Sequence, residues 1–406
     1  LSLYSFVAML DATIIISTLP TILPTFHVPV ASSISWLVSG CVLTTAIFLP
    51  IVSKLCDIVG SKRTFLTTVL LYIVGTTLGG ASTSFKMMLI ARFIQGIGIA
   101  GAVGLTMIIV ARMAGTEALG QAFILFGASM TCGSMAGAPL GGVITEHLGW
   151  RWTFYISLPI AALAAILVIA FLRVPLEPGK KKAVWRDIDY GGALLFTTSA
   201  TTFLLPTIWG GDDFPWNSAP VISCYVVSAV TLAAFVYWEA YHARDPFLPM
   251  NLFRNRTFVI ASFIQLSTGA MMTVLLVYSV LYLQLVRGKS QLDTSLLTTP
   301  YMVAATISGC AVGAVNQRFK VYREPTIVGL ALFIVGAGVC LTWSTGHSPT
   351  VDGLLLIPAG FAGGLAACGS LLGGMQSVDP SQLAPATGFI DFSRCIGGAI
   401  GVAIAS

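Results

Sequence analysis

Apolar stretches of about twenty residues recur along the whole chain, and they constrain its fold more than any other feature. A helix of about 20 apolar residues spans the roughly 30 Å hydrocarbon core of a bilayer, because each residue adds about 1.5 Å of length. Only 9% of the 406 residues are charged, and the mean hydropathy is +0.89. Soluble domains carry about 25% charged residues, so the sequence excludes a soluble fold and predicts a helical membrane protein.

Thirteen apolar stretches can be identified, and most segments between them are too short to form a soluble domain. The stretches are 1–23, 34–55, 64–83, 87–111, 119–145, 153–173, 189–209, 219–239, 257–286, 294–315, 325–343, 353–376 and 387–406. They predict an all-α polytopic bundle with thirteen spans. Because an odd number of spans does not divide into two equal halves, we expect a fourteenth helix beyond Ser406.

The distribution of lysine and arginine predicts the orientation of the bundle. If the first stretch begins in the cytoplasm, 15 of these residues lie on the cytoplasmic side and 4 on the opposite side. Cytoplasmic loops of membrane proteins carry such an excess. We therefore expect a cytoplasmic N-terminus. The net charge of +5 then belongs to cytoplasmic loops beside the lipid bilayer, and no nucleic-acid partner is predicted.

Four charged residues lie inside the predicted spans: Asp11, Arg92, Asp391 and Arg394. A charge within the bilayer is costly and usually faces an aqueous cavity or a partner, so each is a candidate functional residue. Structural explanations stay open. Arg92 lies near one end of its span, where a long side chain can extend to water, and Asp391 and Arg394 are spaced to pair on one helix face.

Small residues repeat every four positions in three of the predicted spans. The repeats are Gly96, Ala100 and Gly104; Gly133, Gly137 and Gly141; and Gly397 and Gly401. This spacing places the small residues on one face of a helix and lets a neighbouring helix approach closely. The repeats therefore predict tight helix packing, and by themselves they indicate no particular function.

The stretch 53–63, SKLCDIVGSKR, resembles the motif between helices 2 and 3 of the major facilitator superfamily, G-x-L-a-D-r-x-G-r-[RK]. The matching residues are Leu55, Asp57, Gly60, Lys62 and Arg63. Ser53 replaces the first glycine of the motif, and Ile58 and Ser61 replace basic positions. By this resemblance, Asp57 with Gly60, Lys62 and Arg63 forms a latch that biases the conformation of the protein.

Two further stretches resemble motifs of the same superfamily. RFIQGIG, residues 92–98, is similar to the fourth-helix motif R-x-x-Q-G-x-G, matched by Arg92, Gln95, Gly96 and Gly98. GSMAGAPLGG, residues 133–142, is similar to the fifth-helix antiporter motif G-x-x-x-G-P-x-x-G-G. Its matching residues are Gly133, Gly137, Gly141 and Gly142. The sequence departs from the motif at two positions: Ala138 stands where proline is expected, with Pro139 directly after it, and Ile124 occupies the leading glycine position.

Additional stretches narrow the resemblance to the fourteen-helix drug:proton antiporters, and they occur in the order of that family. They are LDATIIISTLPTI at 10–22, WRWTFYISLP at 150–159, DIDYGGALL at 187–195, PFLPMNLFRNRTF at 246–258 and FSRCIGGAIGVAIA at 392–405. WGGDDFPWNS, residues 209–218, resembles fungal members most. The chain thus looks like a fungal-type multidrug or toxin efflux transporter that lacks helix 14.

The resemblance implies two pseudo-symmetric halves of six helices with two additional central helices between them. The expected parts are an N-terminal half (1–173), a cytoplasmic linker (174–188), the two additional helices (189–239), a second linker (240–256) and a truncated C-terminal half (257–406). An internal repeat agrees with this division. Residues 313–329 align with residues 53–69, so that Gly313 matches Ser53, Arg323 matches Arg63 and Gln317 replaces Asp57.

The implied mechanism is alternating access driven by protons. A carboxyl group in apolar surroundings holds its proton more tightly, and a nearby cation has the opposite effect. Asp11 and Asp391 are therefore the expected sites for a proton or a cationic substrate, and Arg92 resembles the residue that the family associates with proton coupling. We expect a small organic substrate, protons in place of a cofactor, a functional monomer, and the plasma membrane rather than the vacuolar membrane.

The sequence leaves alternatives to drug efflux. The main alternative is proton-coupled uptake, or vacuolar transport, of a nutrient such as a basic amino acid or an iron chelate; a channel or a sensor is a further one. RGKS at 287–290 is no P-loop because Leu283 stands at the required glycine. The four histidines lie at loops or span ends, and no HExxH or CxxC occurs, so neither an enzyme nor a metal site is predicted.

Overall fold

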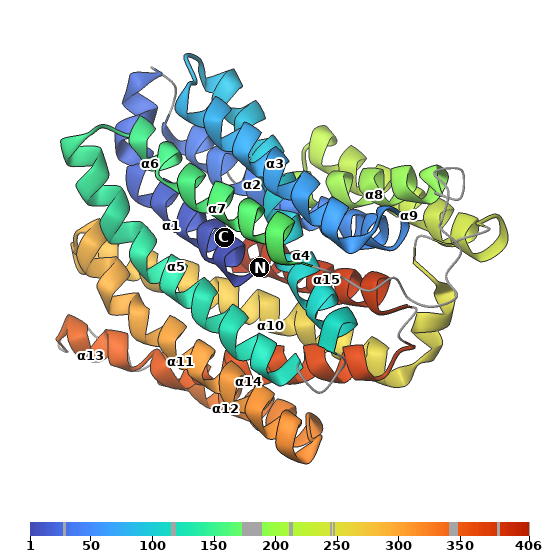
Figure 1. The fold of residues 1–406 in the computed structure, drawn as a ribbon. Coiled ribbons are helices and arrows are strands. Elements are labelled where there is room, and N and C mark those ends of the chain that lie inside the picture. The colour runs from blue at the N-terminus through green and yellow to red at the C-terminus, as the bar shows by residue number, and fades with distance from the viewer. Residues whose placement is uncertain are drawn as a thin grey trace.

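A computed structural model describes the chain as a bundle of helices (Figure 1). The described residues are 1–26, 30–114, 119–172, 189–210, 214–243, 246, 248–340, 348–379 and 382–405. The predicted linker 174–188 lies entirely outside them. Each predicted span corresponds to one helix or to two helices in direct succession, so the all-α architecture is confirmed.

The first seven α-helices form one group, drawn blue to green in Figure 1. They are α1 (Ser2–Thr25), α2 (Val30–Val59), α3 (Ser61–Gly80), α4 (Phe85–Ala114), α5 (Leu119–His147), α6 (Arg151–Tyr155) and α7 (Ser157–Phe171). In this group α1 packs along α5, while α4 packs along both α2 and α3. The sixth predicted span, 153–173, corresponds to α6 and α7, which meet at Ile156.

The last part of the chain, drawn yellow to red, repeats this arrangement. It contains η2 (Met250–Arg254), α10 (Arg256–Leu281), the π-helical turn η3 (Tyr282–Val286), α11 (Gln291–Phe319), α12 (Arg323–Cys340), α13 (Pro349–Leu354), α14 (Ile357–Gln376) and α15 (Leu383–Ala405). Here α10 packs along α15, and α14 packs along both α11 and α12. When the short helix α13 is taken together with α14, these are the same positional pairs as in the first group.

The backbone of the internal repeat supports the same symmetry. Gly60 separates α2 from α3 with a φ of 96°, and Lys320 caps α11 with a φ of 55°. The two residues occupy equivalent positions in the aligned segments 53–69 and 313–329. A left-handed residue here lets each helix end abruptly and the next one start at once. Lysine tolerates this conformation at a higher conformational cost than glycine.

The two groups contact each other mainly through two pairs of helices, α5 with α11 and α2 with α15. The remaining helices, α8 (Tyr190–Trp209) and α9 (Ala219–Tyr241), pack against each other, and α8 also contacts α2 and α15. Figure 1 shows α8 and α9 at the side of the bundle. The additional helices therefore cover one of the two seams between the groups.

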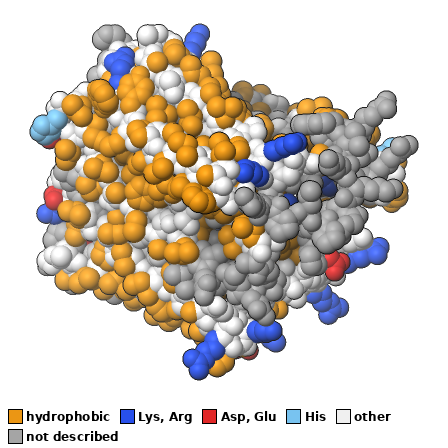
Figure 2. Space-filling view, viewed as in Figure 1, with side chains coloured by type: hydrophobic (Ala, Val, Ile, Leu, Met, Phe, Trp, Pro, Cys, Tyr) orange, Lys and Arg blue, Asp and Glu red, His pale blue; other side chains and the backbone are white. Residues whose placement is uncertain are grey.

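The outer surface is apolar over much of its area. Figure 2 shows apolar side chains across the left and centre of one face, with lysine and arginine mainly toward its right, upper and lower parts. On α9, Val230 is 63% exposed and Tyr237 is 60% exposed. Such side chains incur no cost in contact with lipid tails, whereas a soluble surface of this kind would associate. Among the described residues, six segments are long and apolar enough to cross a bilayer, so the number of thirteen spans stays a prediction.

The predicted orientation can be tested at the two ends of α11. Lys289 precedes this helix and Lys320 follows it, so they should lie on opposite sides of the membrane. In a cysteine-free background, we expect a membrane-impermeant maleimide to label Lys289→Cys in intact cells. Lys320→Cys should be labelled only after permeabilisation, which also serves as the control that both sites react. Labelling of both from one side would show that α11 does not cross the membrane.

Candidate functional site

A buried ion pair joins α1 to α4. Arg92 Nη1 donates to Asp11 Oδ2 at 3.0 Å, and both residues are only 2% exposed. The two side chains are separated by 81 positions in the sequence and come together because the first five helices pack around them. Arg92 therefore extends into the bundle interior, and the alternative that it reaches outward to water is not what the structure shows.

The other hydrogen bonds of Arg92 explain the polar residues of the fourth-helix motif. Arg92 Nη1 donates to Gln95 Oε1 at 2.6 Å, and Arg92 Nε donates to the carbonyl oxygen of Leu37 on α2 at 3.2 Å. Gln95 Nε2 in turn donates to Thr76 Oγ1 on α3 at 2.9 Å. The network thus includes groups from four helices, and a buried charge requires such partners.

The glycines of the same motif allow these helices to approach. A Cβ atom at Gly96 would lie 2.6 Å from the carbonyl oxygen of Cys41 on α2, and one at Gly98 would lie 2.7 Å from the Cα atom of Tyr72 on α3. Both separations are shorter than non-bonded atoms can approach each other. Only glycine at the two positions keeps α4 close enough to its neighbours for Arg92 and Gln95 to reach their partners.

The fifth-helix glycines face the part of α1 that carries Asp11. A Cβ atom at Gly137 would lie 2.6 Å from the carbonyl oxygen of Leu10 and would overlap the hydroxyl of Thr13. A Cβ atom at Gly133 would overlap the carbonyl oxygen of Phe6. Gly133 and Gly137 therefore determine how closely α5 packs against α1 on both sides of Asp11. Pro139 lies inside α5, which continues to His147, with Gly141 and Gly142 on the same helix.

The charges of α15 have a different arrangement. Asp391 is 6% exposed, and Arg394 follows it by one turn. Within the described residues, no hydrogen bond or ion pair joins the two side chains, although their charges attract each other through space. The local pairing that their spacing allows is therefore not formed in this structure.

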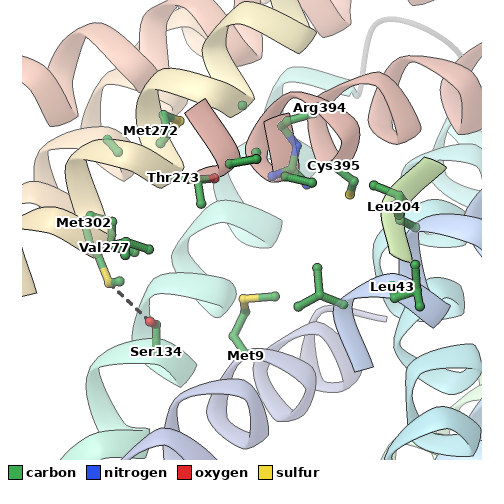
Figure 3. Close-up of a pocket in the computed structure, with 18 of the residues that line it drawn as sticks. Met9, Leu43, Ser134, Leu204, Met272, Thr273, Val277, Met302, Arg394 and Cys395 are labelled. Carbon is green, nitrogen blue, oxygen red and sulfur yellow. Dashed lines mark hydrogen bonds between the residues drawn. The ribbon is translucent and has the colours of Figure 1, made fainter. Parts of the chain in front are cut away.

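A cavity of about 680 Å³ lies between the two helix groups (Figure 3). Its walls come from α1, α2, α5, α8, α10, α11 and α15, and they are mainly apolar, with four methionines among them. The lining residues are Met9, Val42, Leu43, Ala46, Met130, Thr131, Ser134, Leu204, Thr207, Gly210, Gly269, Met272, Thr273, Leu276, Val277, Tyr301, Met302, Ala305, Arg394, Cys395, Gly398, Ala399 and Ala403. Methionine side chains adapt to ligands of different shape, as promiscuous binding surfaces require.

The cavity and the buried ion pair are separate. Met9 lines the cavity, whereas Asp11 contacts Arg92; two residues along a helix differ in direction by about 200°. Of the four predicted charged residues, only Arg394 lines the cavity. The lining residues cannot be identified from the sequence, because apolar residues that face a cavity and those that face lipid have the same hydropathy.

The residues predicted to form a latch lie at the junction of α2 and α3. Lys62 Nζ donates to the carbonyl oxygen of Ile169 on α7 at 2.7 Å, while Arg63 is exposed. The side chain of Asp57 lies outside what the structure describes. Arg112, which the sequence did not single out, donates to Ser61 Oγ at 2.9 Å and to Cys56 Sγ at 3.3 Å. It therefore holds α4 against this junction.

The structure contains a second ion pair that the sequence did not predict. Arg287, after η3, donates to Asp352 on α13, and the Asp352 side chain is fully buried. The hydrogen bonds to this carboxylate raise the pKa of Arg287 above its ordinary value. Asp352 lies directly before the predicted span 353–376, and an acidic residue at the end of a span is not distinctive in a hydropathy profile. The pair connects the end of α10 to the start of the α13–α14 segment.

Comparison with known proteins identifies the family. The sequence model of the Major Facilitator Superfamily matches residues 1–402. MFS transporter L2 of Phoma sp. is 26% identical over 98% of this chain and 66% of its own length. MFS-type efflux pump MFS1 of Arthroderma benhamiae is 27% identical over 97% of this chain and 74% of its own length. The chain thus spans about two thirds to three quarters of these relatives.

A solved structure shows the same fold. The proton:xylose symporter XylE, bound to 6-bromo-6-deoxy-D-glucose, superposes with a TM-score of 0.69 at 16% identity, over 98% of this chain and 85% of that structure. The family match, the paired helix groups and the cavity between them agree with one another. The chain therefore belongs to the Major Facilitator Superfamily and is a membrane transporter, not an enzyme.

Proposed function

We propose that the chain is the transport unit of a secondary carrier that exports small organic molecules in exchange for protons. The observation that carries this proposal is the cavity, whose walls come from both helix groups. A carrier that alternates its access needs a central site between two halves that move against each other. The apolar, methionine-rich lining suits drug-like or toxin-like molecules, and the efflux-pump relative supports the outward direction.

The contact between α2 and α15 supports an assignment of this structure within the transport cycle. A Cβ atom at Gly388 would lie 2.9 Å from Ser53 Oγ and 3.0 Å from Pro50 Cα, so the two helices nearly touch there. With a cytoplasmic N-terminus, this contact closes the cytoplasmic side. The cavity begins farther along α15, at Arg394, and continues toward Ala403. We infer an outward-facing state.

For proton coupling we propose Asp11 as the main proton site, with Arg92 and Gln95 as its partners and Asp391 as a second acid. Protonation of Asp11 would remove the charge that holds Arg92. The position of α1 affects α5 through Gly133 and Gly137. On α5, Thr131 hydrogen-bonds Thr306, and Ser134 donates to Met302, both on α11 of the other half. This route connects the proton site to the interface that must rearrange.

The test is transport by the full-length protein in proteoliposomes, with and without an imposed pH gradient. The panel contains hydrophobic drugs, organic acids and amino acids. We expect accumulation of hydrophobic compounds only when the gradient is present. Accumulation of amino acids would favour the nutrient carrier instead. Basic amino acids are disfavoured by the cavity, because its described lining holds no carboxylate. Flux that no substrate saturates would indicate a channel.

We further propose a monomer in the plasma membrane, with Asp57 as part of the latch at the junction of α2 and α3. Asp57→Asn should reduce the turnover rate about tenfold or more while leaving the substrate Kd within a few-fold, because the residue biases conformations and lies away from the cavity. Initial transport rates and equilibrium binding to the purified protein measure the two effects. A loss of affinity at unchanged turnover would contradict a latch.

A further inference from the structure

Arg394 is the only charged side chain among the described residues that line the cavity. It enters from α15, and Figure 3 shows its nitrogen atoms on the cavity side of that helix, near Thr273 of α10. Its guanidinium makes no hydrogen bond or ion pair within the described residues. Every other lining residue that the structure describes is uncharged.

A guanidinium group in such a place lacks partners that it needs. It carries five N–H donors in a planar fork, and a carboxylate, sulfonate or enolate can accept two of them at once. Asp391 reduces the positive charge through space but accepts none of these donors. An anionic group of a substrate would supply the missing acceptors, and the mainly apolar lining of the cavity would strengthen the contact.

The rest of the cavity defines the remainder of the substrate. Met272 and Met302 from the C-terminal half, with Met9 and Leu43 from the N-terminal half, surround the space beside Arg394 with apolar surface. Thr273 and Ser134 place hydroxyl groups at its wall. The arrangement accommodates a hydrophobic body next to a single anionic head.

We propose that the carrier binds amphiphilic organic anions, and that Arg394 selects them through a hydrogen-bonded ion pair with the anionic group. The proposal rests on the transport function proposed above and specifies its substrate class. It gives Arg394 a direct role in substrate recognition, distinct from the proton site at Asp11 and Arg92. The acids Asp11 and Asp391 suggested a cationic substrate in the sequence, whereas this proposal predicts that cationic drugs are poor substrates.

The test uses a matched pair of probes, dansylglycine and dansylglycinamide, which share the same apolar body and differ in one carboxylate. Binding to the purified full-length protein is followed by dansyl fluorescence at a pH where the acid is ionised. We expect the acid to bind at least about tenfold more tightly than the amide. Arg394→Gln should weaken binding of the acid about 10- to 100-fold and leave the amide within about twofold.

Two further variants separate recognition from packing. Arg394→Lys keeps the charge and loses the planar fork, so binding of the acid should be intermediate. Met302→Ala removes apolar surface without a change of charge, and it should weaken both probes by the same factor. Thermal unfolding of each variant, monitored without ligand, shows whether it is folded.

The outcomes distinguish this proposal from the transport function itself. Equal binding of acid and amide to the wild type, or equal losses in Arg394→Gln, would overturn the anion proposal while drug transport stands. Tighter binding of ethidium, a cationic probe, in Arg394→Gln with no effect on dansylglycine would overturn it as well. Absence of gradient-driven transport for every compound in the panel would instead refute the transport proposal.

Discussion

Asparagine in place of Asp11 is expected to abolish substrate accumulation driven by a pH gradient. The substitution keeps the size of the side chain and fixes its neutral form, so position 11 can no longer take up and release a proton. Exchange of substrate down its own gradient should continue, because Asp11 does not line the cavity. The measurement is uptake into proteoliposomes with an imposed pH gradient, compared with counterflow in its absence.

The buried ion pair makes a control for stability necessary. Asp11→Asn leaves the charge of Arg92 without a counter-charge, and breaking a buried pair in this way costs about 3–5 kcal/mol. The double variant Asp11→Asn with Arg92→Gln removes both charges and should recover much of the lost stability. If coupling returns together with stability, the pair serves only the fold. If stability returns and coupling does not, Asp11 carries the proton.

Two single variants complete this set. Arg92→Lys keeps a charge, but its single nitrogen cannot replace both Nη1, which contacts Asp11 and Gln95, and Nε, which contacts Leu37, so coupling should also fail. Asp391→Asn tests the second acid, whose effect we expect to be smaller. Normal accumulation by Asp11→Asn, Arg92→Lys and Asp391→Asn alike would favour a facilitator that uses no proton.

Alanine in place of Gly137 is expected to destabilise the protein by about 1–3 kcal/mol, the usual cost of forcing an extra group into a packed interior. The new methyl group would lie 2.6 Å from the carbonyl oxygen of Leu10, and backbone cannot rotate away as a side chain can. Because Leu10 precedes Asp11, the displacement of α1 should also impair proton coupling. Thermal unfolding in detergent and pH-driven accumulation measure the two effects.

The matched control lies on the same helix. A Cβ atom at Gly127 would have its nearest contact 3.7 Å away, at Thr306 Cγ2, which is an ordinary van der Waals distance. Gly127→Ala should therefore leave stability unchanged or raise it by up to about 1 kcal/mol, because alanine favours helix more than glycine does. Equal unfolding temperatures for Gly127→Ala and Gly137→Ala would show that close packing of α5 on α1 is not required.

The sequence was sufficient to locate the helices, because hydropathy is a local property that a single helix expresses without its neighbours. The ordered motifs identified the family, which the match over residues 1–402 confirms. The repeat of 53–69 in 313–329 predicted the symmetry that the paired helix contacts display. Helix ends differ from the predicted ones by a few residues, since hydropathy does not register where backbone hydrogen bonding stops.

Only the tertiary structure decided which charges meet. Asp391 and Arg394 are close in sequence and do not pair, whereas Asp11 and Arg92 pair across 81 positions because α1 and α4 place them together. The pair of Arg287 and Asp352 likewise depends on two distant segments that come together at one end of the bundle. The direction of Arg394 toward the cavity, and hence the proposed preference for anions, follows from how the two halves pack. The sequence determined that these charges lie within an apolar bundle, and the packing of helices distant in sequence determined what each of them contacts.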